Sequence, residues 1–361
     1  MSRNILKSNN SFVGSSNLDD KQAFHTGDKN LNLFNLTQTA SFSVDLAHER
    51  LKQLGSNDYA VNDPFTQPDV QLSISYIPNA DLNNEKHNFF SLEHSAGIKL
   101  TPALSGSTNA STNFYIFNDP DQGEDAFTDL TLSSNLNLSG YEILAFGNAF
   151  LTDYSVNYEV GGMPLVATSY ICSNMKFENA TGTSMESVAI NLESGNNTNV
   201  GRCNFHFSNG SKTPTVIRPV GNNQSSVTMQ NLQVGGQVLS GLHLLQSVNL
   251  NVSLPRISSY GLGSDYAYNR KFQSPAQGSF SSTSLVSGFS EGNITGVLSN
   301  ESGYSFDLVF KSGSQECLYR VENAKLESYS YSMEVNGQMS FDSSFSFPVT
   351  EDGGLLISGV A

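Results

Sequence analysis

Hydrophobic and polar residues alternate one by one in two segments of the chain. In residues 154–160, Tyr, Val, Tyr and Val alternate with Ser, Asn and Glu. In residues 329–335, Tyr, Tyr, Met and Val alternate with polar residues in the same way. Alternation with a period of two is typical of a β-strand with one buried and one polar face. Each segment therefore predicts a strand of this kind.

The two strands belong to longer segments, residues 148–172 and 323–347, that are similar to each other. An internal repeat has to be recognised first, because it determines how the rest of the chain is interpreted. Aligned without a gap, the segments share Asn148/Asn323, Ala149/Ala324, Leu151/Leu326, Tyr154/Tyr329, Ser155/Ser330, Glu159/Glu334, Val160/Val335, Gly162/Gly337 and Ser169/Ser344. The sequence thus predicts that one strand unit occurs twice.

A second block recurs in the same order along the chain. Residues 42–46 and 248–254 alternate between apolar and polar, and an arginine follows each of them, Arg50 and Arg256. A Gly-containing turn and the loop Asp-Tyr-Ala-x-Asn-x-x-Phe-x-x-Pro come next in both copies, at 58–68 and at 265–275. Two repeated blocks in one order predict a duplicated domain.

The repeats set the predicted domain organisation. Val, Ile, Tyr, Phe and Thr are frequent and no long segment has helical periodicity, so we expect a mostly β protein with two tandem, duplicated β-sandwich domains. The first copy has 32 residues more between its blocks than the second. The predicted units are an N-terminal arm (1–40), a first β domain (41–180) with an insertion around 78–125, a connector or additional strands (181–246), and a second β domain with the C-terminal tail (247–361).

Composition narrows the possible functions. The net charge of −15 argues against sequence-reading binding of DNA or RNA, although it permits a protein that stays close to DNA without holding it. No stretch is apolar enough to predict membrane insertion, and the polar residues 1–20 do not resemble a secretory signal. The three cysteines have no disulfide or zinc spacing, so we expect buried free thiols.

No catalytic constellation is present in the sequence. The six histidines lack metal-ligand spacing, and there is no nucleophile elbow, P-loop or dinucleotide fingerprint. The best metal candidate, Asp119, Asp121, Glu124 and Asp125, lacks the pattern of a calcium loop, and a solvated acidic loop is the favoured interpretation. We therefore expect neither an enzyme nor a bound cofactor or metal.

The succession of alternating strand, Arg, Gly turn, Tyr-Ala, Phe-x-x-Pro and second alternating strand resembles the tail tube proteins of long-tailed bacteriophages. The resemblance is closest to those with a duplicated tube domain, and it covers about residues 41–177 and 247–348. It implies a virion protein assembled in the host cytoplasm, with three chains in each ring. The inner sheets of six domains would join into a barrel around a lumen that conducts DNA, and the rings would stack into a tube. Implied partners are other copies, the tape measure, baseplate and terminator proteins, and the sheath.

The resemblance also assigns roles to the repeated residues. The polar sides of the repeated strands become lumen-facing candidates: Ser155, Asn157, Glu159, Ser330, Ser332 and Glu334. The repeated loops become candidates for contacts between subunits or between rings, through Arg50, Tyr59, Phe65, Arg256, Tyr266 and Phe272. A structural role is the more economical one for two symmetric arginines.

Three other functions remain open at this point. A trimeric baseplate hub or tail-end protein would use the same duplicated domain. A surface-binding β module, such as an adhesin, is a different class, but the chain has no Trp for stacking on a sugar. An enzyme would need the catalytic residues that the sequence lacks.

Overall fold

The fold was derived from a computed structural model. The residues that the structure describes are 11–17, 28–34, 36–45, 48–52, 54–55, 59–64, 69–78, 84–85, 98–99, 111–118, 140–179, 184–186, 188–191, 196–199, 202–207, 225–230, 233–234, 237–238, 245–261, 266–267, 269–286, 303–312, 315–333, 337–350 and 354–360. Within these ranges the fold is mostly β, as the composition predicts, with 26 strands.

Eight antiparallel strands form one inner sheet in the order β3-β6-β10-β9-β19-β22-β25-β24. Their bounds are β3 Thr37–Asp45, β6 Asp69–Tyr76, β9 Glu142–Glu159, β10 Leu165–Cys172, β19 Leu245–Ser253, β22 Ala276–Leu285, β24 Gln315–Ser332 and β25 Ser340–Val349. The first four strands of this order come from the first half of the chain and the last four from the second half. The pairing of β9 with β19 therefore joins the two halves within one sheet.

A second layer covers one face of the inner sheet, and the two long strands β9 and β24 take part in both layers. The first part of β9 pairs with β8 and β11, and β1, β2, β15 and β12 extend this outer sheet. The first part of β24 pairs with β23 and β26, which β16 and β7 extend. These strands are β1 Ser11–Asn17, β2 Asp28–Leu33, β7 Ile98–Lys99, β8 Thr112–Asn118, β11 Asn174–Asn179, β12 Ser184–Glu186, β15 Arg202–Phe207, β16 Ser225–Gln230, β23 Tyr304–Ser312 and β26 Leu355–Val360.

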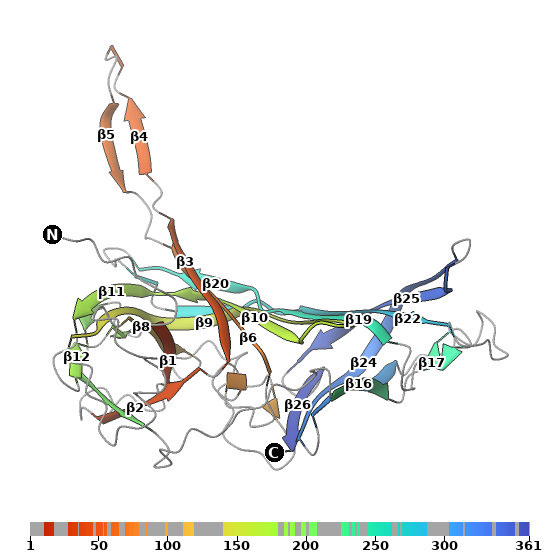
Figure 1. The fold of residues 1–361 in the computed structure, drawn as a ribbon. Helices are drawn as coiled ribbons and strands as arrows, with labels where there is room; N and C mark the ends of the chain where they lie inside the picture. The colour runs from red at the N-terminus through yellow and green to blue at the C-terminus, as the bar shows by residue number, and fades with distance from the viewer. Residues whose placement is uncertain are drawn as a thin grey trace.

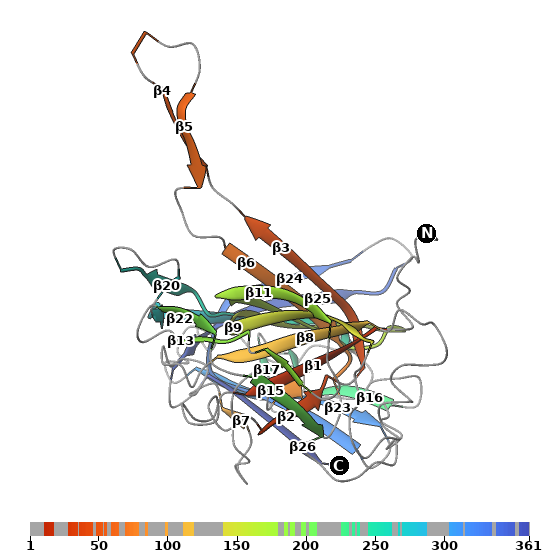
Figure 2. The same ribbon diagram turned by 90° about the vertical axis from the view of Figure 1, so that its left-hand side faces the viewer.

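Four two-stranded hairpins complete the described strands. The hairpin of β4 and β5 stands apart from both layers and projects beyond the end of β3, whereas β20 lies along the body (Figures 1 and 2). The hairpins are β4 His48–Lys52 with β5 Tyr59–Pro64, β13 Ile190–Asn191 with β14 Asn196–Asn199, β17 Gln233–Val234 with β18 Gln237–Val238, and β20 Arg256–Ser259 with β21 Asn269–Phe272.

The same pairings occur in both halves, and so do their irregularities. The pairing of β10 with β9 skips Thr152, and that of β25 with β24 skips Glu327 at the corresponding position. The pairing of β6 with β3 skips Gln38, and that of β22 with β19 skips Gln246. Asn148 and Asn323 also both have a positive φ, of 49° and 58°, where each long strand passes from the outer to the inner layer. A shared bulge re-aims a strand in the same way in both halves.

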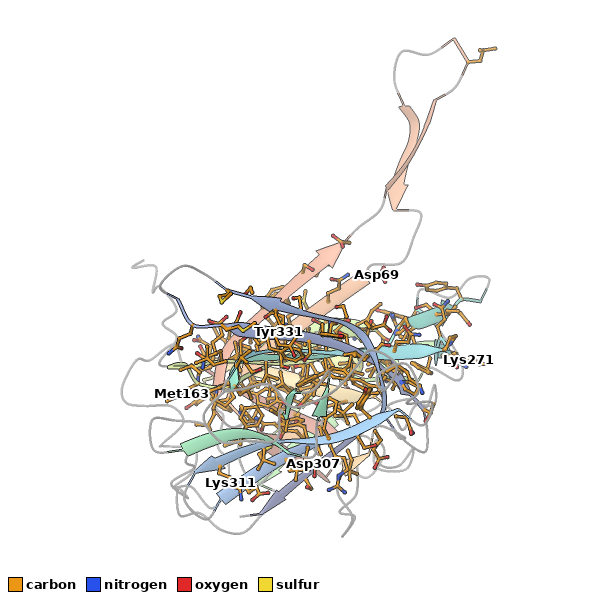
Figure 3. All side chains as sticks on the ribbon, turned by 90° about the vertical axis from the view of Figure 1, so that its right-hand side faces the viewer. Asp69, Met163, Lys271, Asp307, Lys311 and Tyr331 are labelled. Carbon is orange, nitrogen blue, oxygen red and sulfur yellow. The ribbon has the colours of Figure 1, made fainter. Side chains whose placement is uncertain are left out.

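One hydrophobic core lies between the layers and extends through both halves. Leu72, Tyr154 and Val156 from the first half and Leu250 and Phe345 from the second are fully buried in the same cluster. Figure 3 shows side chains filling the space between the layer that carries Tyr331 and the layer that carries Asp307 and Lys311. The two strand sets therefore fold onto a common core rather than forming two spatially independent units.

The segments outside the repeats also supply strands. The predicted arm, residues 1–40, contains β1, β2 and the beginning of β3, and Phe12 and Val13 of β1 are buried. In the connector, residues 181–246, β15 pairs with β2 in the first half and β16 with β23 in the second. From the insertion, β7 pairs with β26 of the second half. The predicted arm, insertion and connector thus lengthen the outer sheets.

Candidate functional site

The face of the inner sheet opposite the core is lined by small polar side chains. Residues directly paired in an antiparallel sheet share a face, so the register gives rows of neighbours across the strands. One row crosses seven strands from the first half into the second without a charge: Thr39, Ser75, Ala167, Ser155, Asn251, Ser279 and Ser346. On the eighth strand, β24, the row ends at Lys325, which pairs with Ser346. We call this side of the inner sheet the polar face.

Side chains on the polar face hydrogen-bond to one another. The hydroxyl oxygens of Thr39 and Ser75 are 2.6 Å apart, and the Thr283 hydroxyl donates to Asp342 Oδ1 at 2.7 Å. The hydroxyls of Ser332 and Ser340 are 2.5 Å apart. Short side chains held in this way give a polar surface with few extended groups.

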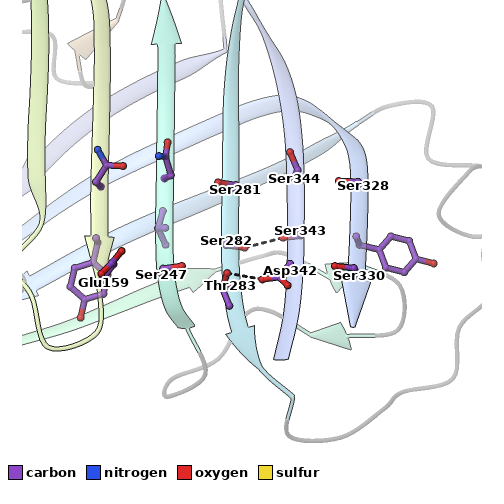
Figure 4. A pocket seen from close by; sticks show the side chains of 15 residues that line it. Glu159, Ser247, Ser281, Ser282, Thr283, Ser328, Ser330, Asp342, Ser343 and Ser344 are labelled. Atoms are coloured by element: carbon purple, nitrogen blue, oxygen red, sulfur yellow. Dashed lines mark hydrogen bonds between the residues drawn. The ribbon is translucent and has the colours of Figure 1, made fainter. Parts of the chain in front are cut away.

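A shallow groove of about 360 Å³ lies on the second-half part of the polar face. Figure 4 shows the five strands beneath it, with Glu159, Ser247, Thr283 and Asp342 in one row across them. The residues that line the groove include the carboxylates of Glu159 and Asp342 and no Lys or Arg. Its electrostatic character is therefore neutral to acidic.

The structure places five of the six lumen-facing candidates on the polar face, while Glu334 lies outside the described residues. Ser155 and Asn157 pair with Asn251 and Asn249 of β19. The remaining three are Glu159, which pairs with Ser247, Ser330, which pairs with Asp342, and Ser332, which pairs with Ser340. The opposite, apolar side is shorter than the alternation suggests, because Val160 lies in the turn after β9 and is exposed, as is Met333.

Of the loop candidates, Arg256 is the best defined, and it contacts the other half of its own chain. Its Nε donates to the carbonyl of Leu151 at 3.0 Å, and its guanidinium carbon lies 5.0 Å from the ring centroid of Phe150. Its Nη1 also donates to the carbonyl of Arg270 at 3.3 Å. Burial, followed by the charge of Arg270, lowers the pKa of Arg256 to about 10. Arg256 therefore fixes the second-half hairpin onto β9.

Arg270 makes a matching contact from the other strand of that hairpin. Its Nη2 donates to the carbonyl of Cys172 at the end of β10, at 3.4 Å, and its Nη1 to the hydroxyl of Ser258 at 3.2 Å. Burial lowers the pKa of Arg270, while Tyr260, Asp69 and Cys172 raise it. The two arginines together hold β20–β21 against the first half.

The other loop candidates are less fully described. Phe272 is half-buried and packs against the main core, and Tyr266 is half-buried at the edge of the second-half loop. Arg50 and Tyr59 belong to β4 and β5, but their side chains lie outside the described residues, as does Phe65. The first-half hairpin thus has the same two strands as the second-half hairpin but a different position relative to the body (Figure 1).

A second group of polar side chains is buried where the halves meet. Glu85, from the insertion, is fully buried, and Tyr76, Tyr154 and Tyr170 of the first half and Tyr319 of the second interact with it electrostatically. The Tyr154 hydroxyl donates to the Tyr319 hydroxyl at 3.2 Å, which links the two halves. Burial raises the pKa of Glu85 from 4.5 to about 7.

Sequence reasoning did not identify Glu85, Arg270 or the Tyr154–Tyr319 bond. Glu85 lies in an acid-rich stretch that reads as a surface loop, and Arg270 has no arginine at the corresponding position of the first loop. Only the partial match of the two tyrosine-containing strands pointed towards this region. These contacts depend on how the halves pack, which periodicity does not report.

Metal-ligand groups, free cysteines and membrane-spanning helices would each indicate another function, so we looked for them in the described part of the chain. No group of three or more His, Cys, Asp or Glu side chains in the described ranges is arranged to hold a metal ion. The candidate metal loop at 119–125 lies outside these ranges. Cys172 and Cys317 are buried free thiols, as predicted, whereas the Cys203 side chain is not among those described. Among the described residues, no helix has the length and apolar character needed to span a membrane.

Comparison with known proteins gives little similarity. No protein-family model matches the chain, and no curated protein matches it either. One similar solved structure is a chain of the virion of a native gene transfer agent particle, with a TM-score of 0.23 and 12% identity, covering 38% of this chain and 96% of that chain. Another is a chain from the tail of an empty gene transfer agent particle with C6 symmetry, with a TM-score of 0.24, 11% identity and the same coverage. Similarity at these TM-scores carries no argument about function.

Proposed function

We propose that the chain is a structural subunit of a phage-like tail, a tail tube protein whose copies form rings of three chains that stack around a channel for DNA. The observation that carries the proposal is the uncharged row of the polar face, which continues across the join between the halves. The row contains Ser155, and Asn157 and Ser330, which the resemblance also assigns to the lumen, lie in neighbouring rows of the same polar face.

The chemistry of the polar face suits a surface along which DNA slides. Protein binding to DNA gains most of its affinity when Lys and Arg displace counterions from the phosphates. The groove offers hydroxyls, amides and the carboxylates of Glu159 and Asp342 in place of cations. A passing duplex would keep its counterions, so the surface would not retain it.

The correspondence of the halves supports the ring. Four strands with one register and one set of bulges occur twice in the inner sheet. We interpret them as a duplicated tube domain, so that three chains would supply six similar sheets around one axis. Strand-to-strand contacts of this head-to-tail kind close into a ring when the rotation permits.

The proposed setting is the virion tail, with other tail proteins as partners. The first-half hairpin β4–β5, which projects from the body, is the element best placed to reach a neighbouring ring (Figure 2). We assign Arg50, Tyr59 and Phe65 of this region to contacts between copies. Arg256 and its hairpin contact the first half within the chain. This contact shows how a hairpin of this kind can bind a neighbouring inner sheet.

Protection of engineered thiols tests the channel. The Asn157→Cys variant should react with a bulky maleimide before assembly and become protected once tubes form. The matched control is Phe177→Cys, because Phe177 is 68% exposed on β11 of the outer sheet and should stay reactive. The wild-type chain corrects for natural thiols. Equal labelling of Asn157→Cys before and after assembly would contradict a channel lined by the polar face.

A trimeric hub at the end of the tail is the alternative, since it would use the same inner sheet. The additional outer strands β7, β12, β15 and β16 favour it, because they go beyond the repeated strand set. The two functions differ in stacking. A hub would stop at isolated trimers, whereas a tube protein would continue into stacked rings.

A further inference from the structure

In the part of the chain that the structure describes, the two ends of the inner sheet are open edges. Among the described strands, β6 is the one that pairs with β3, and β25 is the one that pairs with Leu326–Ser332 of β24. Apolar side chains are exposed at both edges, with Phe42 at 43% and Val44 at 36% on β3 and Met333 at 75% just after β24. Open strand edges of this kind readily pair with another chain.

The chain contains one junction in which the strands corresponding to these edges meet. β9 corresponds to β24 and β19 to β3, and β9 pairs with β19 over seven residues, from Ser247↔Glu159 to Ser253↔Asp153. Four apolar residues of that junction, Tyr154, Val156, Leu250 and Val252, are all at 0% exposure. The internal junction therefore shows how a strand equivalent to β24 pairs with a strand equivalent to β3.

The shared bulges give the correspondence residue by residue. Because the skipped residues Thr152 and Glu327 are equivalent, Asp153 corresponds to Ser328. Because the skipped residues Gln246 and Gln38 are equivalent, Ser253 corresponds to Asp45. These two correspondences determine which residue of β24 would face which residue of β3 if the open edges paired as β9 and β19 do.

Resting on the function proposed above, we propose that β24 of one copy pairs antiparallel with β3 of a second copy in the register of the β9–β19 junction. The pairs are Ser328↔Asp45, Tyr329↔Val44, Ser330↔Ser43, Tyr331↔Phe42 and Ser332↔Ser41, with the first residue of each pair in one copy and the second in the next. The interface is the two sheet edges, and the partner is a second copy of this chain.

The side chains fit this register on both faces. Tyr331 would meet Phe42 and Tyr329 would meet Val44 on the apolar face, where aromatic and β-branched cross-strand pairs are favourable. The hydroxyls of Ser330, Ser332, Ser41 and Ser43 would meet on the opposite side and extend the polar face into the next copy. A one-residue slip would place these serines against the tyrosines, which fixes the register.

The new junction differs from the internal one in one respect. Within the chain, Arg256 packs over Phe150 beside the β9–β19 junction. The position equivalent to Phe150 in the second half is Lys325. The junction between copies therefore lacks this arginine-on-ring contact, and we expect it to separate under conditions that leave the internal junction intact.

Crosslinking of the full-length chain tests the register. The variant Ser41→Cys/Ser332→Cys, treated with a short bifunctional thiol reagent under assembly conditions, should give a covalent trimer as its final product. The matched control is Ser41→Cys/Ser328→Cys, in which the second cysteine is four residues out of register. It should remain mostly uncrosslinked, since four strand residues span about 13 Å.

The outcomes distinguish a failure of the proposed register from a failure of the proposed function. Rings or tubes visible by electron microscopy, with the control pair crosslinked as well as or better than the predicted pair, would overturn the register and leave the proposed function in place. A chain that stays monomeric at high concentration would overturn both. Ladders that continue beyond the trimer would contradict the three-chain ring while supporting the edge contact.

A second pair of variants covers the case in which the cysteines impair assembly. Phe42→Asp places a charge on the exposed edge and should abolish ring formation while the monomer still folds, with a lower melting temperature because the contact with the Phe146 ring is lost. Phe177→Asp, on the outer sheet, should assemble normally. Normal assembly of Phe42→Asp would overturn the proposed edge contact.

Discussion

The two halves of the inner sheet have the same pairings but fill one corresponding position in different ways. In the first half, Val70 pairs with Cys172 across the strands β6 and β10. In the second half, Gly278 pairs with Phe347 at the equivalent place, and all four residues are buried. The Phe347 ring beside Gly278 in the second half thus takes the place of the valine and cysteine side chains in the first half.

The difference shows what the repeat maintains. Volume at the core face is kept constant by compensation between neighbours, as close packing of protein interiors requires. On the polar face, Ser155 and Ser169 correspond to Ser330 and Ser344, whereas Asp153 corresponds to Ser328 and Ala167 to Asp342. The core tolerates exchanges of size between strands, whereas these positions of the polar face keep short side chains and vary in charge.

The largest predicted effect comes from breaking this compensation. A Cβ on Gly278 would overlap the Phe347 ring, so Gly278→Val should destabilise the fold by about 3 kcal/mol. Urea unfolding measures the change. The double variant Gly278→Val/Phe347→Cys recreates the first-half pair and should recover most of the loss. If the double variant is no more stable than Gly278→Val alone, the compensation is not local to this pair.

The buried carboxyl that joins the halves should make stability depend on pH. The folded-state pKa of Glu85 is about 7, above its ordinary 4.5, so the folded state binds the proton more tightly. This contribution is fully present below about pH 4.5 and is lost as the pH rises through 7. Glu85→Gln should therefore remove a decline on the order of 3 kcal/mol between pH 5 and pH 8. The exposed Glu142→Gln is the control and should leave the decline unchanged in unfolding experiments at both pH values.

The hairpin contact between the halves should be weaker but specific for arginine. Arg256→Lys removes the planar donors that reach Leu151 and Arg270, and it should cost about 2 kcal/mol in unfolding free energy. Lys311→Gln is the control, because the Lys311 side chain is 43% exposed and pairs with Glu316, whose side chain is 25% exposed, on the outer sheet. An exposed pair contributes roughly 1 kcal/mol or less. Equal losses in the two variants would argue against a special role for Arg256.

The smallest predicted effect concerns the hydroxyl pair that links the halves. Tyr154→Phe and Tyr319→Phe should each destabilise the chain by about 1 kcal/mol, because each removes the hydrogen bond between the two buried hydroxyls. The double variant should cost less than the sum of the two single changes. Additive losses in this double-mutant cycle would show that the two hydroxyls do not interact.

Much of the inner sheet could be predicted from alternation. The repeated strands, their buried Tyr and Val face and their polar Ser and Asn face follow from a period of two at 154–159 and 329–332. The first part of β9 does not alternate, because nearly all its residues between Ala145 and Leu151 are buried between the two layers. Its length therefore depends on tertiary packing that a local pattern does not encode.

The candidate site could be predicted only for residues whose position follows from the alternation along the strands. The polar face could be inferred, but the role of Arg256 within the chain could not, since the same arginine pattern fits a contact between subunits. Additional strands were among the predictions for residues 181–246, but their pairing with the outer sheets was not predicted, nor were the strands β1 and β2 within residues 1–40. Such strands are formed by their partners rather than by their own composition.

Electron microscopy of the purified full-length chain decides whether copies assemble into tubes. We expect hollow tubes of stacked rings with three chains per ring, in which the inner wall is the polar face that carries Ser155, Asn157 and Ser330. Monomers that persist at high concentration, or assemblies in which this face points outwards, would contradict this expectation.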